Sequence, residues 1–273
     1  MEFITLINKQ LPPANQYFVE LKMGTTALAS ERERDTILSN IENLPVTKGI
    51  LRQLLPDSHL LGNLMDCVMK LFQCRINRIC KCHKEVNEAH ANYEMYPSSI
   101  FLPFSVFQDL YAQLLTPQQI IASYFSTTTG EPLDMNSIRK VYFLSKATDS
   151  NTVWVVYIID IELHTIKYLD PRRNSNAVVS NDLTVHLNSI RRDMLTGFLT
   201  ILIPGYVEAW ACSALFLYYF APLTNDGDFN SGLYITAAIY FICNDVPLFF
   251  DAGTISRLRF NLSYWLLVEE LPV

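Results

Sequence analysis

The sequence predicts an α+β fold, in which helices come first and a mixed sheet with further helices follows. Three observations predict it. Between residues 44 and 94, apolar residues recur at three- and four-residue steps, which is the period of a helix. From residue 140, short continuous apolar runs appear, as in strands covered on both faces. A segment beginning at Ser231 is apolar almost all round, which is typical of a helix buried inside a domain.

Length and composition fit a globular protein with a sizeable core. The chain has 273 residues, 50% of them hydrophobic, and a formal charge of −6. This apolar content excludes a disordered chain and allows one domain, or a domain with an extension. The acidic balance argues against nucleic acid as the main partner.

Cysteine usage and the first residues predict an intracellular protein. The six cysteines are irregularly spaced, which does not form a disulfide framework in a chain of this length. Residues 1–10 lack the basic segment and apolar run of a secretory signal. We therefore expect the cytoplasm or nucleus, and an organellar address stays open.

Residues 1–44 are predicted as an N-terminal extension and residues 45–273 as the main domain. Within the extension, residues 2–8 could form a short strand, and the charged residues 29–35 are typical of a solvated helix face. In the main domain, Pro56, Asp57 and Ser58 separate two helices and supply capping residues for the second.

The second helix carries two polar features. Its possible zinc ligands are Cys74, Cys80, Cys82 and His83. No Cys-x-x-Cys pair is present, and adjacent residues on a helix point to different faces, so we predict no metal site and no cofactor. Its basic residues at three-residue spacing are Arg75, Arg78, Lys81 and Lys84, and such a stripe is most often a solvated face.

The remaining elements alternate between helix and strand. Residues 104–114 predict a helix that stops before Pro117, and residues 116–137 a long loop or a helix and a loop. Strands are expected at 140–145, 153–161, 165–169, 214–222 and 247–250, and helices at 182–199, from Ser231, and at 254–268. A turn at residues 163–164 makes 153–169 a hairpin, which brings Val153 and Asp170 to the same end.

Residues 195–223 are apolar enough to be weighed as a membrane segment. Pro204, Gly205 and Glu208 interrupt them, which leaves roughly 15 uninterrupted residues where a spanning helix needs about 20. We predict a buried segment. A membrane-associated or toxic protein acting through residues 195–250 remains an alternative.

Three segments together resemble a known family. They are residues 152–160 (Thr-Val-Trp-Val-Val-Tyr-Ile-Ile-Asp) with 166–170, residues 228–234 (Asp-Phe-Asn-Ser-Gly-Leu-Tyr), and residues 246–251 with a closing helix at 255–267. Over roughly residues 45–270 the chain resembles the SUMO and ubiquitin-like-protein-specific cysteine proteases, in a divergent form seen in plant or transposon-derived members. The resemblance implies an adenain-like, papain-related fold.

The resemblance also locates four catalytic positions. The family's general base, a His before a Trp, matches Val153 before Trp154. The Asp that orients this His is kept as Asp170. The oxyanion-stabilising Gln matches Asn225, and the nucleophilic Cys matches Ser231. Only one of the four residue types is therefore retained.

These changes predict an inactive protein. Val153 takes no proton, and a serine without a base is a very weak nucleophile at neutral pH. His164 would lie at the far end of the hairpin, about 33 Å away along ten residues of strand. The family pattern places none of the other histidines near Ser231; they are His59, His83, His90 and His186.

The surviving residues also have structural explanations. Asn230 or Ser231 could cap the buried helix, and Gly232 would allow close packing at its start. Asp170 before Pro171 is a common turn residue. Trp154 fits a core position or the wall of a cleft.

The predicted function is that of a pseudoprotease that binds another protein, such as SUMO or a ubiquitin-like protein. Its binding groove would contain Trp154, Asn230, Ser231 and Gly232. The alternative is a residual serine-type hydrolase or isopeptidase that uses Ser231. Both functions follow from the resemblance, since a fold by itself does not dictate function.

Overall fold

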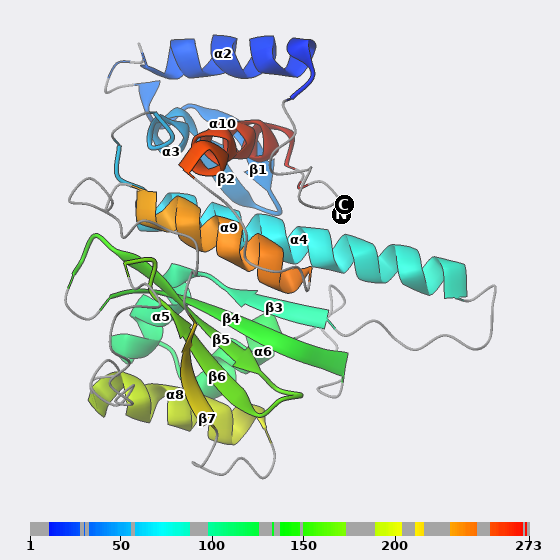
Figure 1. Cartoon of the computed structure of the whole chain (residues 1–273), viewed down its shortest axis with the longest axis vertical. Coiled ribbons are helices and arrows are strands. Elements are labelled where there is room, and N and C mark those ends of the chain that lie inside the picture. The colour runs from blue at the N-terminus through cyan, green and yellow to red at the C-terminus, as the bar shows by residue number, and fades with distance from the viewer. Residues whose placement is uncertain are drawn as a thin grey trace. The chain divides into compact units, whose positions relative to one another are not determined.

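The computed structural model divides into two compact units, which are described separately (Figure 1). The helical unit comprises Met1–Arg75, Pro171–Asn174 and Leu217–Val273, and the sheet unit comprises Ile76–Asp170 and Ser175–Phe216. The structure describes residues 11–27, 30, 33–55, 58–87, 98–125, 133, 137–147, 150–172, 189–203, 211–215, 230–244, 252–269 and 271.

Among its described residues, the helical unit packs four helices and the start of a fifth with a two-stranded hairpin. Its elements are α2 (Pro13–Ala27), β1 (Ile37–Ile41), β2 (Leu44–Thr47), α3 (Lys48–Arg52), the first half of α4 (Gly62–Asn87), α9 (Ser231–Cys243) and α10 (Ala252–Val268). Every residue from Ser231 to Phe241 of α9 is buried. This confirms the helix that the sequence predicted from its apolar surface.

The β1–β2 hairpin spans the boundary predicted at residue 44. Glu42 and Asn43 form its turn with φ angles of 42° and 72°, as a two-residue hairpin of this twist requires. The Ser39 hydroxyl donates to the Leu266 carbonyl of α10 at 2.6 Å. Residues 44–47 were expected to be helical and are a strand; the helix begins at Lys48, because the Thr47 hydroxyl caps it by accepting from the Ile50 N–H at 3.3 Å.

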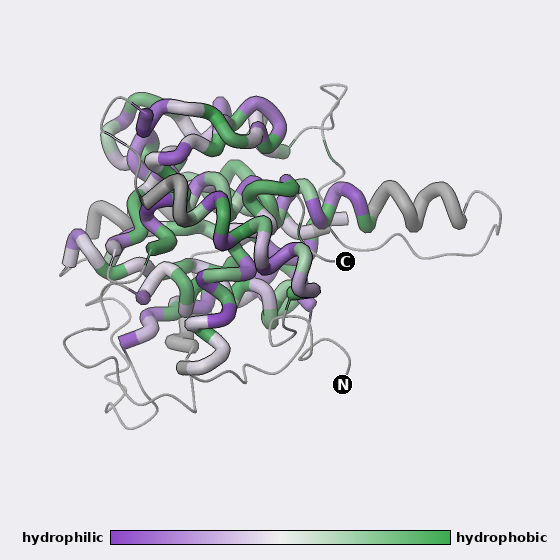
Figure 2. The backbone as a smooth tube through the Cα atoms, turned by 90° about the horizontal axis from the view of Figure 1, so that it is seen from above, coloured by the Kyte–Doolittle hydropathy of each residue, from purple (hydrophilic) through white to green (hydrophobic). Residues whose placement is uncertain are grey.

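Helix α4 corrects one prediction about charge. Hydrophobic and hydrophilic residues alternate along its described part, as on a helix with one buried face (Figure 2). Arg75, expected on a solvated stripe, is 2% exposed. Its Nη2 donates to Asn244 Oδ1 at 2.9 Å, and its guanidinium lies 5.4 Å from the centre of the Tyr240 ring. The amide and the aromatic face give this buried cation its partners, so it packs within the unit.

The rest of the predicted polar features on α4 are only partly described. Arg78 and Cys74 are half-buried, whereas the side chains of Lys81, Lys84, Cys80, Cys82 and His83 lie outside the described residues. Among the side chains that the structure describes, no group of three His, Cys, Asp or Glu could hold a metal ion.

The sheet unit contains a five-stranded mixed sheet in the order β3-β4-β5-β6-β7. The strands are β3 (Ser98–Leu102), β4 (Ile138–Lys146), β5 (Trp154–Asp160), β6 (Thr165–Leu169) and β7 (Ala211–Leu215). The two outer pairs are parallel and the two inner pairs antiparallel. The hairpin predicted at 153–169 is thus confirmed. The parallel strand β3 was not expected, because its five residues give too short a pattern to distinguish from a loop.

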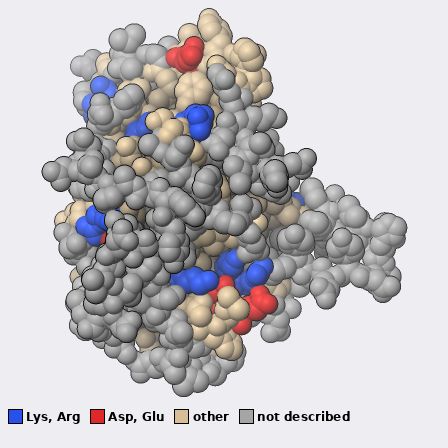
Figure 3. All heavy atoms as spheres, viewed as in Figure 1, with Lys and Arg blue, Asp and Glu red and all other residues tan. Residues whose placement is uncertain are grey.

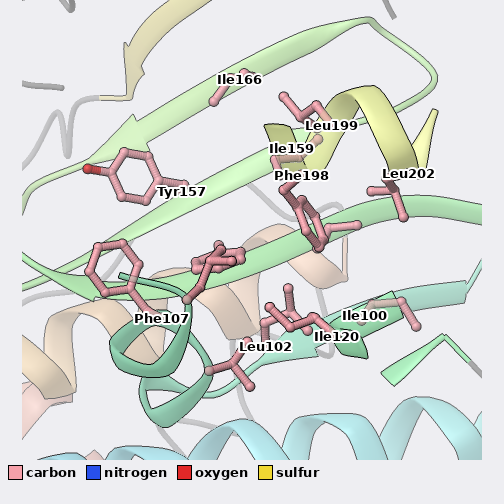
Figure 4. Close-up of a cluster of buried hydrophobic side chains, with 14 of the residues drawn as sticks. Ile100, Leu102, Phe107, Ile120, Tyr157, Ile159, Ile166, Phe198, Leu199 and Leu202 are labelled. Atoms are coloured by element: carbon pink, nitrogen blue, oxygen red, sulfur yellow. The ribbon is translucent and has the colours of Figure 1, made fainter. Parts of the chain in front are cut away.

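The described helices of this unit are α5 (Phe104–Tyr111), α6 (Pro117–Tyr124) and α8 (Ser189–Leu202). The start of the segment expected as a loop or helix-loop is the helix α6, whose first turn carries a capping box between Thr116 and Gln119. Figure 4 shows side chains from strands and helices meeting in one apolar cluster, with Phe198 of α8 5.8 Å from Phe143 of β4 between ring centres. Each fully buried side chain of this kind contributes about 1.5–3 kcal/mol through removal from water.

Some predicted segments are only partly covered. Helix α8 ends at Leu202, and among the described helices none is long and apolar enough to cross a membrane. The expected strand at 214–222 appears as β7 at Ala211–Leu215, and residues 216–222 lie outside the described residues. The expected strands at 2–8 and 247–250 also lie outside them. The closing helix is confirmed as α10.

Candidate functional site

The β5–β6 hairpin brings together two of the four positions that the resemblance predicts to be catalytic. Val156 pairs with Leu169, and continuing this antiparallel register by one residue places Val155 opposite Asp170. Side chains alternate along a strand, so Val153 shares the face of Val155 and is a diagonal neighbour of Asp170. A base at position 153 would therefore lie within reach of the Asp170 carboxylate. Asp170 itself is 1% exposed.

Val153, to which the resemblance assigns the base, is an apolar core residue. Its side chain is 1% exposed and belongs to the same cluster as Val155 and Tyr157. Its backbone is fixed as well: the N–H donates to Ser150 Oγ at 3.3 Å, and the carbonyl accepts from the Ala147 N–H at 2.9 Å. The hairpin thus keeps a carboxylate beside a group that can neither take nor give a proton.

Trp154 is covered by two neighbours in the sheet unit. The indole is 1% exposed. The Phe104 ring meets it edge-on at 4.9 Å between centres and 82°. The Lys146 ammonium lies 3.4 Å from the centre of the indole ring and donates to the Thr152 carbonyl at 3.1 Å. Lys146 is the cross-strand partner of Trp154, so the pairing of β4 with β5 places the cation on the ring.

The N-terminus of α9, in the helical unit, holds the predicted nucleophile position Ser231 and its neighbours Asn230 and Gly232. Ser231 and Gly232 are both buried, and Ser231 is 0% exposed. Asn230 occupies the capping position but makes no capping hydrogen bond with its side chain, contrary to one of the structural roles expected for it. Its Oδ1 instead accepts a hydrogen bond of 2.8 Å from Arg259 Nη2 of α10.

Arg259 is a residue of this turn that the sequence did not indicate. Its Nη1 donates to the carbonyls of Leu55 at 2.7 Å and Gln53 at 3.2 Å, just after α3. One guanidinium therefore joins α10, the end of α3 and the residue before Ser231. The sequence signal was a lone Arg in an amphipathic helix, which is ordinarily a solvated side chain.

Neither His164 nor Tyr234 offers a base at these positions. His164 is exposed in the hairpin turn with a φ of 52°, at the opposite end of β5 and β6 from Val153. Tyr234 lies in the first turn of α9, and burial raises its pKa, so its phenol is protonated at neutral pH. Asn225 lies outside the described residues.

The chain was compared with known proteins and solved structures. No protein-family model and no curated protein matches it. The SUMO protease Ulp1 with its catalytic cysteine oxidised to a sulfenic acid matches with a TM-score of 0.66 and 17% identity, over 96% of this chain and 97% of that chain.

Two further solved structures match over similar lengths. The Ulp1 protease domain in complex with Smt3, the yeast ortholog of SUMO, has a TM-score of 0.66 and 17% identity, over 95% of this chain and 96% of that chain. The Ulp1-like SUMO protease catalytic domain of Chaetomium thermophilum has a TM-score of 0.58 and 15% identity, over 96% and 92%. At such identities a likeness speaks for the fold and not for the activity. The chain therefore has the α+β fold of the Ulp1 SUMO protease, with helices and a mixed central sheet.

Proposed function

We propose that this chain is a catalytically inactive, protease-like protein that works inside the cell by binding another protein. The observation that carries the proposal is Val153. The resemblance to the protease family assigns the general base to this position, and here an isopropyl group packs into the apolar cluster of the sheet unit. The neighbouring Asp170 then has no imidazole to orient, and Ser231 has no base from the family's set.

The proposed partner is SUMO or another ubiquitin-like protein. Its support is the fold likeness to a protease domain whose structure contains Smt3. Each unit carries predicted contact residues for such a partner: Trp154 in the sheet unit, and Asn230, Ser231 and Gly232 in the helical unit. Because Trp154 and Ser231 are nearly inaccessible, we expect the partner to contact the residues around them.

Two features argue against a nucleic-acid partner and against a serine-type hydrolase. In the lower part of the face drawn in Figure 3, described basic side chains lie beside acidic ones, and the formal charge of −6 on the whole chain argues against nucleic acid as the partner. A serine-type hydrolase would need an accessible hydroxyl, and the Ser231 side chain is 0% exposed.

A binding titration tests the proposal. The whole chain is titrated against fluorescently labelled SUMO and, separately, ubiquitin, and we expect saturable binding to one of them. A tail-reporter substrate is included in parallel, and we expect no turnover. Absence of binding to both would overturn the proposed partner class. Turnover that disappears in Ser231→Ala would overturn the proposed inactivity.

A further inference from the structure

The sheet unit presents an exposed threonine directly before a proline. Of the 13 prolines in the sequence, only Pro117 follows a serine or threonine. Thr116 is exposed and caps α6, and Pro117 is the first residue of that helix. A proline keeps the residue before it in an extended conformation, and Thr116 accordingly has a φ of −88° and a ψ of 155°. The step therefore places a hydroxyl group on extended backbone at the surface.

The hydrogen bonds that hold the Thr116 hydroxyl lie at the surface. Its Oγ1 donates to Gln119 Oε1 at 3.0 Å and accepts from the Gln119 N–H at 3.3 Å, and both bonds are exposed. Gln118 and Gln119 are exposed as well, and the first buried residue of α6 is Ile120. The first turn of α6 can therefore open and offer an extended segment to an enzyme without bringing Ile120 into water.

We propose that Thr116 is a phosphorylation site for a protein kinase that selects proline after its acceptor. In the transfer, Thr116 Oγ1 forms a bond to the γ-phosphorus of ATP, the bond from that phosphorus to the β–γ bridging oxygen breaks, ADP leaves, and a base of the kinase takes the hydroxyl proton. A kinase pocket that leaves the N–H of the next residue unpaired rejects every residue except proline, which has none. The inference is independent of the proposed function, because Thr116 is not among the predicted catalytic or contact residues.

The fold accommodates a phosphate at this position. The first turn of α6 contains no acidic residue, so no carboxylate of that turn repels the new charge. Phosphothreonine carries a charge of about −1.5 to −2 at neutral pH, and the start of a helix carries a partial positive charge. The Gln119 N–H, which donates to Oγ1, can donate to a phosphate oxygen instead. We therefore expect the phosphorylated chain to stay folded, with a melting temperature raised by about 1–4 °C and a smaller rise at high salt.

The test uses the whole folded chain with Mg²⁺, ATP and a purified proline-directed kinase, one of the cyclin-dependent class and, separately, one of the mitogen-activated class. We expect one phosphate per chain by intact mass spectrometry, mapped to Thr116 by peptide fragmentation. Absence of phosphate from the folded chain with both kinases would overturn the inference. A phosphate found on another residue in place of Thr116 would overturn it as well.

Variants separate the acceptor from its recognition. Thr116→Ala should take up no phosphate, whereas Thr116→Ser keeps a hydroxyl and should take it up. Pro117→Ala restores an N–H, so we expect the rate to fall about tenfold. The matched control is Thr200→Ala, which should leave the rate unchanged: Thr200 is an exposed helical threonine with no proline after it, and its Oγ1 donates to the Thr196 carbonyl at 2.7 Å. An unchanged rate in Pro117→Ala would overturn the selection for proline, and a melting temperature lowered by phosphorylation would overturn the accommodation of the phosphate.

Discussion

The guanidinium of Arg259 holds the residue before Ser231 in place through hydrogen bonds. The backbone carbonyls of Gln53 and Leu55 and the Asn230 amide oxygen accept hydrogen bonds from it. All four residues belong to the helical unit, so this arrangement does not depend on the sheet unit.

The Val153 side chain, unlike that of Arg259, makes only apolar packing contacts. A histidine introduced there would place a polar ring in an apolar cluster, which carries a desolvation cost.

Arg259→Gln should lower the free energy of unfolding by about 1.5–3 kcal/mol, since the partly buried acceptors lose a charged donor. Arg259→Lys should recover only part of the loss, because an ammonium lacks the planar fork of the guanidinium. Urea denaturation measures both. The matched control is Arg257→Gln on the exposed side of the same helix, for which we expect a change within about 0.5 kcal/mol. Equal losses at both positions would contradict the role given to Arg259.

Ser231→Cys should not create a protease. A thiol at the start of a helix becomes more acidic, but a base must still take its proton and then, as an acid, give a proton to the leaving group, and Val153 can do neither. Incubation with a tail-reporter substrate should therefore show no turnover above that of the unaltered chain. Cleavage by this single variant would mean that another residue supplies the proton.

At the scale of elements, helix α9 is the apolar centre of the helical unit and α4 one of its neighbours. Phe72 of α4 lies 6.4 Å from Tyr240 of α9 between ring centres, and Arg75 stacks on the same ring. The Thr236 hydroxyl satisfies itself within the helix by donating to the Gly232 carbonyl at 2.8 Å. A helix with so little polar surface keeps its position through packing more than through hydrogen bonds.

Ile235→Ala in α9 should lower the free energy of unfolding by about 2–5 kcal/mol, because Ile235 is 0% exposed and its removal leaves a cavity. Ile37→Ala is the control in the same unit; its side chain is 59% exposed on β1, so we expect a loss within about 0.5 kcal/mol. Chemical denaturation of both variants measures the difference. Similar losses would indicate that α9 is not tightly packed.

At the scale of the whole molecule, stability should fall as the solution becomes alkaline. Burial, followed by the nearby Asp66 carboxylate, raises the pKa of Cys67 from its ordinary value of 9.0 to about 12. Between these pH values the unfolded thiol has lost its proton while the folded thiol keeps it, so the unfolded state is favoured as pH rises. Burial raises the pKa of Tyr240 in the same sense.

The free energy of unfolding should therefore decrease between about pH 9 and pH 12, by at most about 1.4 kcal/mol per pH unit for each such group. Cys67→Ala should make this decrease shallower, although it lowers stability at neutral pH by leaving a small cavity. Denaturant unfolding at several pH values gives the slope. A slope unchanged in Cys67→Ala would show that the thiol ionises normally in the folded protein.

The sequence by itself determined the fold class and most of its elements. The apolar surface of 231–241 and the continuous apolar run of 153–161 depend on local composition, and periodicity detects such patterns. It also placed Val153 and Asp170 at one end of a hairpin, because a short turn leaves one register.

Only the tertiary structure decided the rest. Short elements such as β3 and the β1–β2 hairpin depend on pairing partners distant in the sequence, so their own residues carry little signal. The burial of Arg75, the bonds of Arg259 to Asn230, and the position of Lys146 on Trp154 each join residues of separate elements. A charged side chain looks solvated in the sequence until the structure supplies an amide, a carbonyl or an aromatic face for it, because those partners come together only when the chain folds.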